Sequence, residues 1–527
     1  MGGRLAVGCS IFVLTLLGFF VFPGHTYLQS DTQIYVPMIE HIWDPSTFPQ
    51  DLVATKPHLS YTLYDEISIA LRWVTRASVQ SVLTTQQLLF RALQILGIYL
   101  LASAFPLARW MALLVAAICS LGATIVGPAI LTIEYEPVPR GFALGLVMLA
   151  IGLAARERPM WASVIASAAF LYHAPTTLPF WIVFGFVTLR RKDYKILAPL
   201  LCAGLLLFAA SRFQAGVAEH QAFFFRIDPE FEKLQRMRAS YNWVSTWIGS
   251  LAWRYLFYWI AGLLAFWRVR PQGGQQFLLG LPLIGVLSVP ISFVLLENFK
   301  WGFIPQFQPA RALLFVTSFA GILSAAAGVH AAQRRRVVEA VLWFAFVFVI
   351  PMQDRIENFL RPRTFLVIGL ALCTALAVAF RRQILVLVVL AAFVLPPTFG
   401  QVHNYSNLED SGVSDLARFL GKRTPKDAML LFADAGGALY PGIVRARSLR
   451  SVYVDWKSGG QVNYYRSLGE EWWSRWRAAN ALAFRPADFL RLPALGVDYV
   501  ILTRASRMPS PAPVYQNSRF VVYRVQE

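Results

Sequence analysis

The chain has 527 residues, of which 57% are hydrophobic and only 15% are charged, and its mean hydropathy is +0.51. Since a soluble globular chain is roughly a quarter charged, this composition excludes an ordinary soluble domain and indicates a polytopic membrane protein surrounded by membrane lipid. The net charge of +19 does not indicate a nucleic-acid-binding protein, because the basic residues cluster between apolar runs, as cytoplasmic anchors do. These clusters are Arg156/Arg158, Arg190/Arg191/Lys192, Arg268/Arg270, Arg334/Arg335/Arg336 and Arg381/Arg382.

The apolar runs predict about 13 transmembrane helices. The first run, 5–22, is long for a secretory signal and lacks a small-residue cleavage site, so we interpret it as an uncleaved span. The block 160–189 is too long for one span and is interrupted at Tyr172-His173-Ala174-Pro175-Thr176, which predicts two short crossings or a re-entrant hairpin. The other predicted spans are 86–105, 108–127, 141–155, 196–212, 247–267, 277–296, 312–331, 337–352, 364–380 and 383–399.

The distribution of charge predicts the orientation of these spans. Arg4 indicates a cytoplasmic N-terminus, and an odd number of spans then places the C-terminus outside. All five basic clusters fall on the cytoplasmic side in this topology. We expect a transmembrane domain over 1–400 and an extracytoplasmic domain over 401–527.

Residues 401–527 contain no run long enough to span a bilayer. Their pattern predicts a small α/β domain, in which helices alternate with short buried strands. The predicted helices are 414–420 and 464–482, and the predicted strands are 428–432, 451–454, 497–503 and 520–525.

Asp31 is the candidate catalytic carboxylate. It follows the first span, where the chain first meets water. Ser30 and Gln33 fit a capping box, which predicts Asp31 in the first turn of a helix, where the helix dipole favours a negative charge. Pro37 predicts a kink or a later start of that helix.

Glu134 and Glu136 are the candidate metal ligands, and they lie in a short, proline-framed outer loop, 132–140. Two carboxylates separated by one residue are suited to a hard divalent cation such as Mg²⁺ or Mn²⁺. Such a metal would neutralise a departing phosphate, with Asp31 as its third ligand, as an orienting group or as a general base. The alternative is that these residues are solvated loop carboxylates.

Three cations are predicted on the outer face, namely Arg140, Lys300 and Arg311. They are candidates to bind the phosphate of a lipid-linked donor, because guanidinium groups bind phosphate oxygens bidentately. The alternative is contact with lipid headgroups or structural pairing, for example Arg140 with Glu136.

His173 is an ionisable residue within an apolar block, and we identify it as the clear intramembrane candidate for function. The alternative is a hydrogen-bonded packing residue. Asp455, in Val454-Asp455-Trp456-Lys457, follows a predicted strand, where sites are common. The group Trp472, Trp473 and Trp476 predicts a membrane interface or a platform on which a sugar stacks.

This layout resembles the GT-C superfamily of polyprenyl-phosphate-sugar-dependent glycosyltransferases, and in particular the catalytic subunit of oligosaccharyltransferase. That family carries a catalytic Asp soon after its first span, and Asp31 occupies that place. Its second outer loop carries an acidic pair, which Glu134-Tyr135-Glu136 matches loosely. The family's Trp-Trp-Asp-Tyr-Gly acceptor motif is missing, and Val454-Asp455-Trp456-Lys457 shares with it only an Asp and an aromatic residue. The chain is also similar to bacterial GT-C-like membrane proteins.

The resemblance implies a glycosyltransferase of the bacterial inner membrane. It would move a sugar from a polyprenyl-phosphate-linked donor to an acceptor at the outer face, with the C-terminal domain in the periplasm. Two alternatives remain, a transporter or flippase of lipid-linked sugars and a non-catalytic GT-C-like scaffold. The absence of P-loop, G-x-S-x-G, H-E-x-x-H and G-x-G-x-x-G motifs argues against an ATP-driven transporter, a lipase-like hydrolase and a zinc protease.

Overall fold

The computed structural model describes residues 2–55, 62–214, 225–247, 249–352, 361–482 and 486–525. The chain forms two compact units, each assembled from segments far apart in the sequence. The first unit comprises 1–25, 84–208 and 241–404, and the second comprises 26–83, 209–240 and 405–527. The second unit therefore contains two predicted outer loops in addition to the C-terminal residues, whereas the sequence suggested one boundary near residue 400. A change in composition marks the end of the last apolar run, but it does not show which earlier loops fold with the residues that follow.

The first unit is helical, apart from the short pair β1 (Thr124–Ile125) and β2 (Ile130–Leu131). Within the described residues, four helices are long and apolar enough to cross a membrane, and further apolar helices are shorter. A helix lies at every predicted span, while the number of membrane crossings stays a prediction. The main helices are α1 (Gly2–Phe20), α4 (Val79–Ala102, which begins in the second unit), α5 (Arg109–Cys119), α6 (Pro139–Ala155), α7 (Pro159–Tyr172), α8 (Ala174–Arg191), α9 (Ala198–Ala210), α11 (Ser250–Val269), α12 (Gln275–Ser292), α13 (Phe303–Phe307), α14 (Leu313–Gln333), α15 (Val337–Met352), α16 (Arg361–Phe380) and α17 (Leu385–Thr398).

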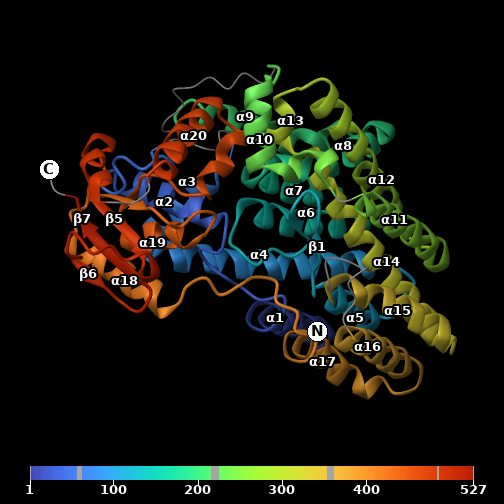
Figure 1. The fold of residues 1–527 in the computed structure, drawn as a ribbon. Helices are drawn as coiled ribbons and strands as arrows, with labels where there is room; N and C mark the ends of the chain where they lie inside the picture. The colour runs from blue at the N-terminus through green and yellow to red at the C-terminus, as the bar shows by residue number, and fades with distance from the viewer. Residues whose placement is uncertain are drawn as a thin grey trace. The chain divides into compact units, whose positions relative to one another are not determined.

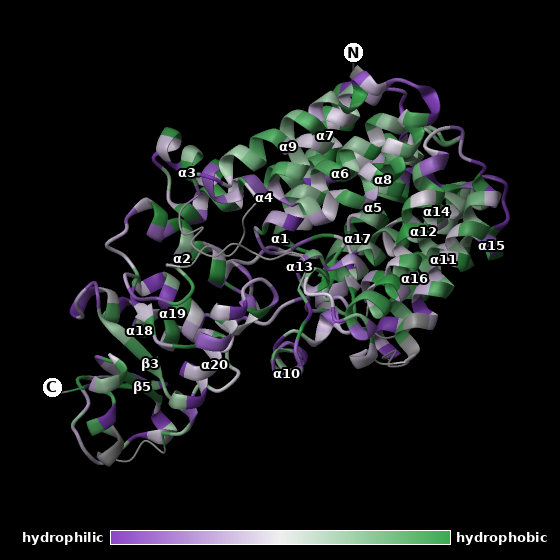
Figure 2. Ribbon diagram, turned by 90° about the horizontal axis from the view of Figure 1, so that it is seen from above, coloured by the Kyte–Doolittle hydropathy of each residue, from purple (hydrophilic) through white to green (hydrophobic). Residues whose placement is uncertain are grey.

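Helix α14 is the core of the first unit. Nearly all of its residues are buried, and it packs against α5, α11, α12, α15 and α16. Figure 1 shows α14, α15 and α16 side by side, and Figure 2 shows that the helices of this unit are mostly hydrophobic. A helix that is apolar on every face is suited to such a central position.

The predicted interruption near residue 173 is present. Helix α7 ends at Tyr172, and α8 begins at Ala174. His173 caps α8, since its Nδ1 accepts from the backbone N–H of Thr176 at 3.2 Å. Pro175 stands in the first turn of α8, where its missing N–H costs nothing.

The second unit contains a five-stranded sheet in the order β4-β3-β5-β7-β6. Strand β3 pairs in parallel with β4 and β5, while β7 pairs antiparallel with β5 and β6. Figure 1 shows α18 and α19 near these strands. The strands are β3 (Met429–Phe432), β4 (Ser451–Val452), β5 (Tyr499–Thr503), β6 (Tyr515–Gln516) and β7 (Phe520–Arg524), and the helices are α2 (Thr32–Trp43), α3 (Tyr64–Thr75), α10 (Pro229–Arg238), α18 (Ser411–Arg423), α19 (Tyr440–Ser448) and α20 (Arg466–Asn480).

Most predicted elements of residues 401–527 correspond to observed ones, but α19 was not predicted. Its sequence combines Pro441, Gly442 and three polar or basic residues, which conceals any apolar periodicity. The helix is nevertheless largely buried, and it packs against α2 and α18. The close approach of α2 explains Gly442, because a Cβ there would lie 2.2 Å from Oε1 of Gln33.

Candidate functional site

Asp31 stands at the N-cap position of α2, directly before its first residue, Thr32. Its side chain makes no capping hydrogen bond. Instead, its Oδ1 accepts from Nζ of Lys457 at 2.5 Å, and the same ammonium donates to Oγ of Ser30 at 2.8 Å. The side chains of Asp31 and Lys457 are 26% and 15% exposed, so the pair remains open to solvent.

The predicted capping box between Ser30 and Gln33 is wrong. The Gln33 amide donates to the carbonyl of Leu28 at 2.8 Å, and Lys457 binds the Ser30 hydroxyl. A lysine far away in the sequence therefore takes the place that a local capping pair would have filled. Pro37 lies inside α2, so of the two predicted effects of this proline the later start is wrong, and the kink stays a prediction.

A buried ionic triad lies behind Lys457, in the same unit. Nη2 of Arg445 lies 2.5 Å from Oδ2 of Asp455, and Nη1 lies 3.5 Å from Oδ1 of Asp51. All three side chains are at most 2% exposed. Asp455 also accepts from the N–H of Ser458 at 3.0 Å, which fixes the turn that carries Lys457.

The tryptophans near this turn pack inward. Arg238 covers the ring of Trp456 at 4.3 Å and donates to the Trp456 carbonyl at 2.9 Å. The indole N–H of Trp472 donates to the carbonyl of Asp455 at 2.9 Å. Because Trp472 is fully buried, it can belong neither to a membrane interface nor to a sugar-stacking platform. Trp473 and Trp476 keep partial exposure.

In the first unit, Glu134 and Arg140 form a close ion pair. Nε of Arg140 donates to Oε1 of Glu134 at 2.6 Å, and Nη2 lies 3.4 Å from Oε2. Helix α6 begins at Pro139, so Arg140 lies in its first turn. Gly141 leaves room for this pair, because a Cβ there would lie 2.8 Å from Cβ of Glu134.

The carboxylates of this loop are not solvated, which rules out the alternative considered for them. Glu134 is 6% exposed and Glu136 is 2% exposed. The structural pairing considered for Arg140 is observed with Glu134, at 2.6 Å, and its pairing with Glu136 stays a prediction.

Two further candidates lie close to this pair. Arg140 and Arg311 are both near enough to His173 to act on it electrostatically. The Arg311 guanidinium lies 5.7 Å from the ring centre of Tyr241. In the first unit, Arg140 contacts Glu134, and Arg140 and Arg311 lie within electrostatic range of His173. Lys300 lies over the ring of Trp243, 5.2 Å from its centre.

The residues do not fit the predicted divalent metal as they stand. Arg140 contacts both carboxylate oxygens of Glu134. Among the described residues, no group of three His, Cys, Asp or Glu side chains is placed to hold a metal ion. The metal stays a prediction, and no step proposed below passes through it.

Asp31 belongs to the second unit, whereas Glu134 and Glu136 belong to the first. Each unit has its own set of interactions around its carboxylate, namely Lys457 for Asp31 and Arg140 for Glu134. The convergence of the three carboxylates on one cavity stays a prediction from the sequence.

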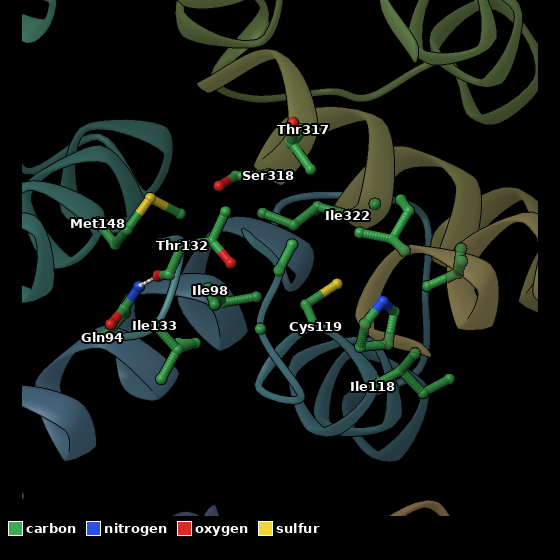
Figure 3. A pocket seen from close by; sticks show the side chains of 16 residues that line it. Gln94, Ile98, Ile118, Cys119, Thr132, Ile133, Met148, Thr317, Ser318 and Ile322 are labelled. Carbon is green, nitrogen blue, oxygen red and sulfur yellow. Dashed lines mark hydrogen bonds between the residues drawn. The ribbon is translucent and has the colours of Figure 1, made fainter. Parts of the chain in front are cut away.

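Two cavities border the loop that carries Glu134. The first is small, about 30 Å³, and Figure 3 shows it between apolar side chains with Gln94 and Thr132 at one end. The second has about 260 Å³ and is lined in part by Tyr135, Arg363, His403 and Asn404. A cavity of about 30 Å³ accommodates one or two water molecules, so the first does not hold a prenyl chain.

A polar stripe on α4, which comprises Gln87, Arg91 and Gln94, was not predicted from the sequence. All three side chains are buried, and all three bind the backbone of the segment 132–134. The pattern was visible, because an arginine within a predicted span is a functional candidate by itself. His173 was therefore not the only clear intramembrane candidate.

No family model matches the chain, and no curated protein matches its sequence. Among solved structures, the chain is similar to ArnT from Cupriavidus metallidurans bound to undecaprenyl phosphate, with 13% identity, a TM-score of 0.49, and coverage of 99% of this chain and 97% of that chain. It is also similar to ArnT from the same organism in the apo state, with the same identity and coverage and a TM-score of 0.42. Similarity at this level assigns no activity and no residue role to this chain.

Proposed function

We propose that this protein is a GT-C-type glycosyltransferase that moves a sugar from a polyprenyl-phosphate-linked donor to an acceptor at the outer face of a bacterial inner membrane. The observation that carries the proposal is the buried ion pair of Arg140 and Glu134, at 2.6 Å, in a unit of apolar helices that also carries Arg311 and His173. Arginines at such a place are suited to the phosphate of a lipid whose tail lies among apolar side chains.

The proposed reaction keeps the roles predicted from the sequence, in which Arg140 and Arg311 bind the donor phosphate and Asp31 acts on the acceptor. The acceptor oxygen or nitrogen attacks the anomeric carbon while its proton passes to the Asp31 carboxylate. The bond between the anomeric carbon and the phosphate oxygen breaks, and its electron pair leaves with the phosphate. The two guanidinium groups stabilise the negative charge that develops there. Attack opposite to the leaving phosphate inverts the configuration at the anomeric carbon.

Lys457 orients the Asp31 carboxylate in this proposal. Its ammonium binds Oδ1 and the Ser30 hydroxyl together, which fixes the direction of the carboxylate at the start of α2. The second unit, with its sheet, is the periplasmic part, and the N-terminus lies in the cytoplasm, with about 13 helices crossing the membrane.

The test is sugar transfer by the purified full-length protein in lipid nanodiscs. The donors are radiolabelled sugars on undecaprenyl phosphate, and the acceptor is the lipid and glycan extract of a bacterial envelope. We expect Asp31→Asn to lower kcat by about 100-fold or more, since a positioned general base typically contributes 10²- to 10⁴-fold. The matched control is Asp415→Asn, which changes an aspartate of α18 whose side chain is 48% exposed and pairs with Arg418 in the same helix.

Arg140→Met separates donor binding from acceptor chemistry in the same assay. Loss of a phosphate contact should raise KM for the donor, whereas Asp31→Asn should lower kcat. Undiminished transfer by Asp31→Asn would exclude Asp31 as the base. A chelator titration tests the predicted metal, because transfer that survives full chelation removes the divalent cation from the reaction.

One observation favours the second candidate, a flippase of lipid-linked sugars. Transporters place ionisable residues within their helices, and both Arg91 on α4 and Arg254 on α11 are buried. Movement of a fluorescent polyprenyl-phosphate sugar between leaflets of proteoliposomes, without any transfer product, would favour that function. Neither transfer nor movement would favour the scaffold.

A further inference from the structure

Helix α4 carries three buried polar side chains on one face, at positions 87, 91 and 94. These spacings of four and three residues align side chains along an α-helix. Gln87, Arg91 and Gln94 are 4%, 4% and 6% exposed, in a helix that is otherwise largely apolar. Burial of this much polarity is costly unless each group finds a partner, so the stripe requires an explanation.

Arg91 binds backbone carbonyls at three places in the chain. Its Nη1 donates to the carbonyl of Gly18 at 2.7 Å. Its Nη2 donates to the carbonyls of Gly24 at 3.0 Å and Glu134 at 2.7 Å. Because the guanidinium is a rigid fork, these bonds hold the end of α1, the segment after it and the loop of Glu134 in one fixed arrangement.

The two glutamines bind the same loop. Nε2 of Gln87 donates to the carbonyl of Glu134 at 3.1 Å, so that carbonyl accepts two hydrogen bonds from α4. Nε2 of Gln94 donates to the carbonyl of Thr132 at 2.6 Å, which Figure 3 shows as a dashed line. The stripe therefore holds both ends of the segment Thr132-Ile133-Glu134.

The same helix also holds the partner of Glu134. Helix α6, which carries Arg140 in its first turn, packs on α4 through glycines. A Cβ at Gly145 would lie 2.4 Å from the carbonyl oxygen of Phe90, and a Cβ at Gly97 would lie 2.3 Å from the backbone of Met148. The backbones of α4 and α6 thus touch, and α4 sets the positions of both members of the pair Glu134 and Arg140.

We propose that Arg91, supported by Gln87 and Gln94, is a positioning residue: it fixes the backbone of Glu134 so that the Glu134 carboxylate holds Arg140 in one orientation. The effect on transfer rests on the proposed function, in which Arg140 binds donor phosphate. The effect on the loop itself does not depend on that function.

The test therefore begins with hydrogen–deuterium exchange of the full-length protein in nanodiscs, read on the peptide 132–141. We expect Arg91→Gln to speed exchange there by at least about tenfold, because it removes charge-assisted hydrogen bonds to buried carbonyls. Arg91→Lys keeps the charge without the fork and should also speed exchange. Peptides of the α14 core should exchange as in the natural protein.

Matched controls come from a neighbouring glutamine and a second buried arginine. Gln86 is 5% exposed and accepts from the hydroxyl of Tyr172. We expect Gln86→Leu to leave exchange of 132–141 unchanged, while Gln87→Leu speeds it. Arg254→Gln removes a buried arginine of α11 and controls for the loss of a buried charge in general.

Unchanged exchange in Arg91→Gln would overturn the proposal, and so would equal acceleration in Gln86→Leu, which would mean that α4 loosens as a whole. If exchange in Arg91→Lys were as slow as in the natural protein, a positive charge alone would suffice. That result would contradict the claim that the several donors of the guanidinium are needed. In the transfer assay, Arg91→Gln should raise KM for the donor about tenfold. Should the natural protein transfer no sugar while the exchange results hold, the proposed function falls and the positioning role stands.

Discussion

The two units hold a buried arginine in opposite ways. In the helical unit, Arg91 donates to the carbonyl dipoles of three backbone positions. In the unit with the sheet, Arg445 lies between the carboxylates of Asp51 and Asp455. Both residues are nearly inaccessible, at 4% and 1% exposure.

The difference shows two ways to place a charge away from water. Around Arg91, carbonyl dipoles from several segments stabilise the positive charge. Arg91 therefore fixes those segments relative to one another. Around Arg445, two carboxylates stabilise the positive charge. Removal of the guanidinium would leave both carboxylates buried without a cation. Loss of Arg445 should therefore destabilise the second unit as a whole, whereas loss of Arg91 should loosen the separate segments that it binds.

The largest expected effect is that of Arg445→Met. We expect the second unit to lose about 3–5 kcal/mol of stability, because the substitution leaves two buried carboxylates without their cation. The free energy of opening can be measured by hydrogen exchange in β3 and β5. The matched control is Arg447→Met, two residues later in α19, where the partly exposed pair with Glu409 should be worth less than about 1 kcal/mol. Equal effects of the two substitutions would contradict the comparison.

Gly145→Ala should destabilise the helical unit by about 1–3 kcal/mol, because the added methyl group overlaps the carbonyl of Phe90 and separates α4 from α6. Thermal unfolding in detergent measures the effect. Gly185→Ala is the control, since nothing lies within 4 Å of a Cβ at that position of α8. Insensitivity of the unit to Gly145→Ala would mean that α4 does not set the position of α6.

Asp65 gives the second unit a pH dependence. Burial, reinforced by the negative charge of Glu66, raises the pKa of Asp65 from 3.8 to about 8. Between these values the folded unit keeps a proton that the unfolded chain has lost, so stability falls as the pH rises from about 4 to about 8, by at most about 1.4 kcal/mol per pH unit. Asp65→Asn should flatten this slope. A slope unchanged by Asp65→Asn would assign the pH dependence to another group.

The smallest expected effect is at the start of α10. Asp228 caps this helix by accepting from the N–H groups of Glu230 at 3.1 Å and Phe231 at 3.0 Å. Asp228→Ala should cost about 1 kcal/mol, and faster exchange of the peptide 229–238 would report it. Asp415→Ala, within an exposed helical face, should leave its own helix nearly unaffected.

The sequence alone determined the features that depend on neighbouring residues. Apolar runs indicated a helix at every predicted span, and the interruption at His173 was visible because a proline follows it. Strands such as β3 and β5 were visible as short apolar runs between polar segments. Local pattern is sufficient in these cases because each element forms from residues a few positions apart.

Only the tertiary structure decided the partners of the charged residues. Asp31 and Lys457 are 426 positions apart, and no local rule selects Lys457 over the other cations of the chain. Likewise, Arg91 was visible as an arginine in a span, but its role at Glu134 follows from three carbonyls that meet only when α1, α4 and the loop before α6 pack together. Long-range ion pairs and hydrogen bonds depend on the positions of several segments at once, and that information is not carried by the periodicity of any single segment.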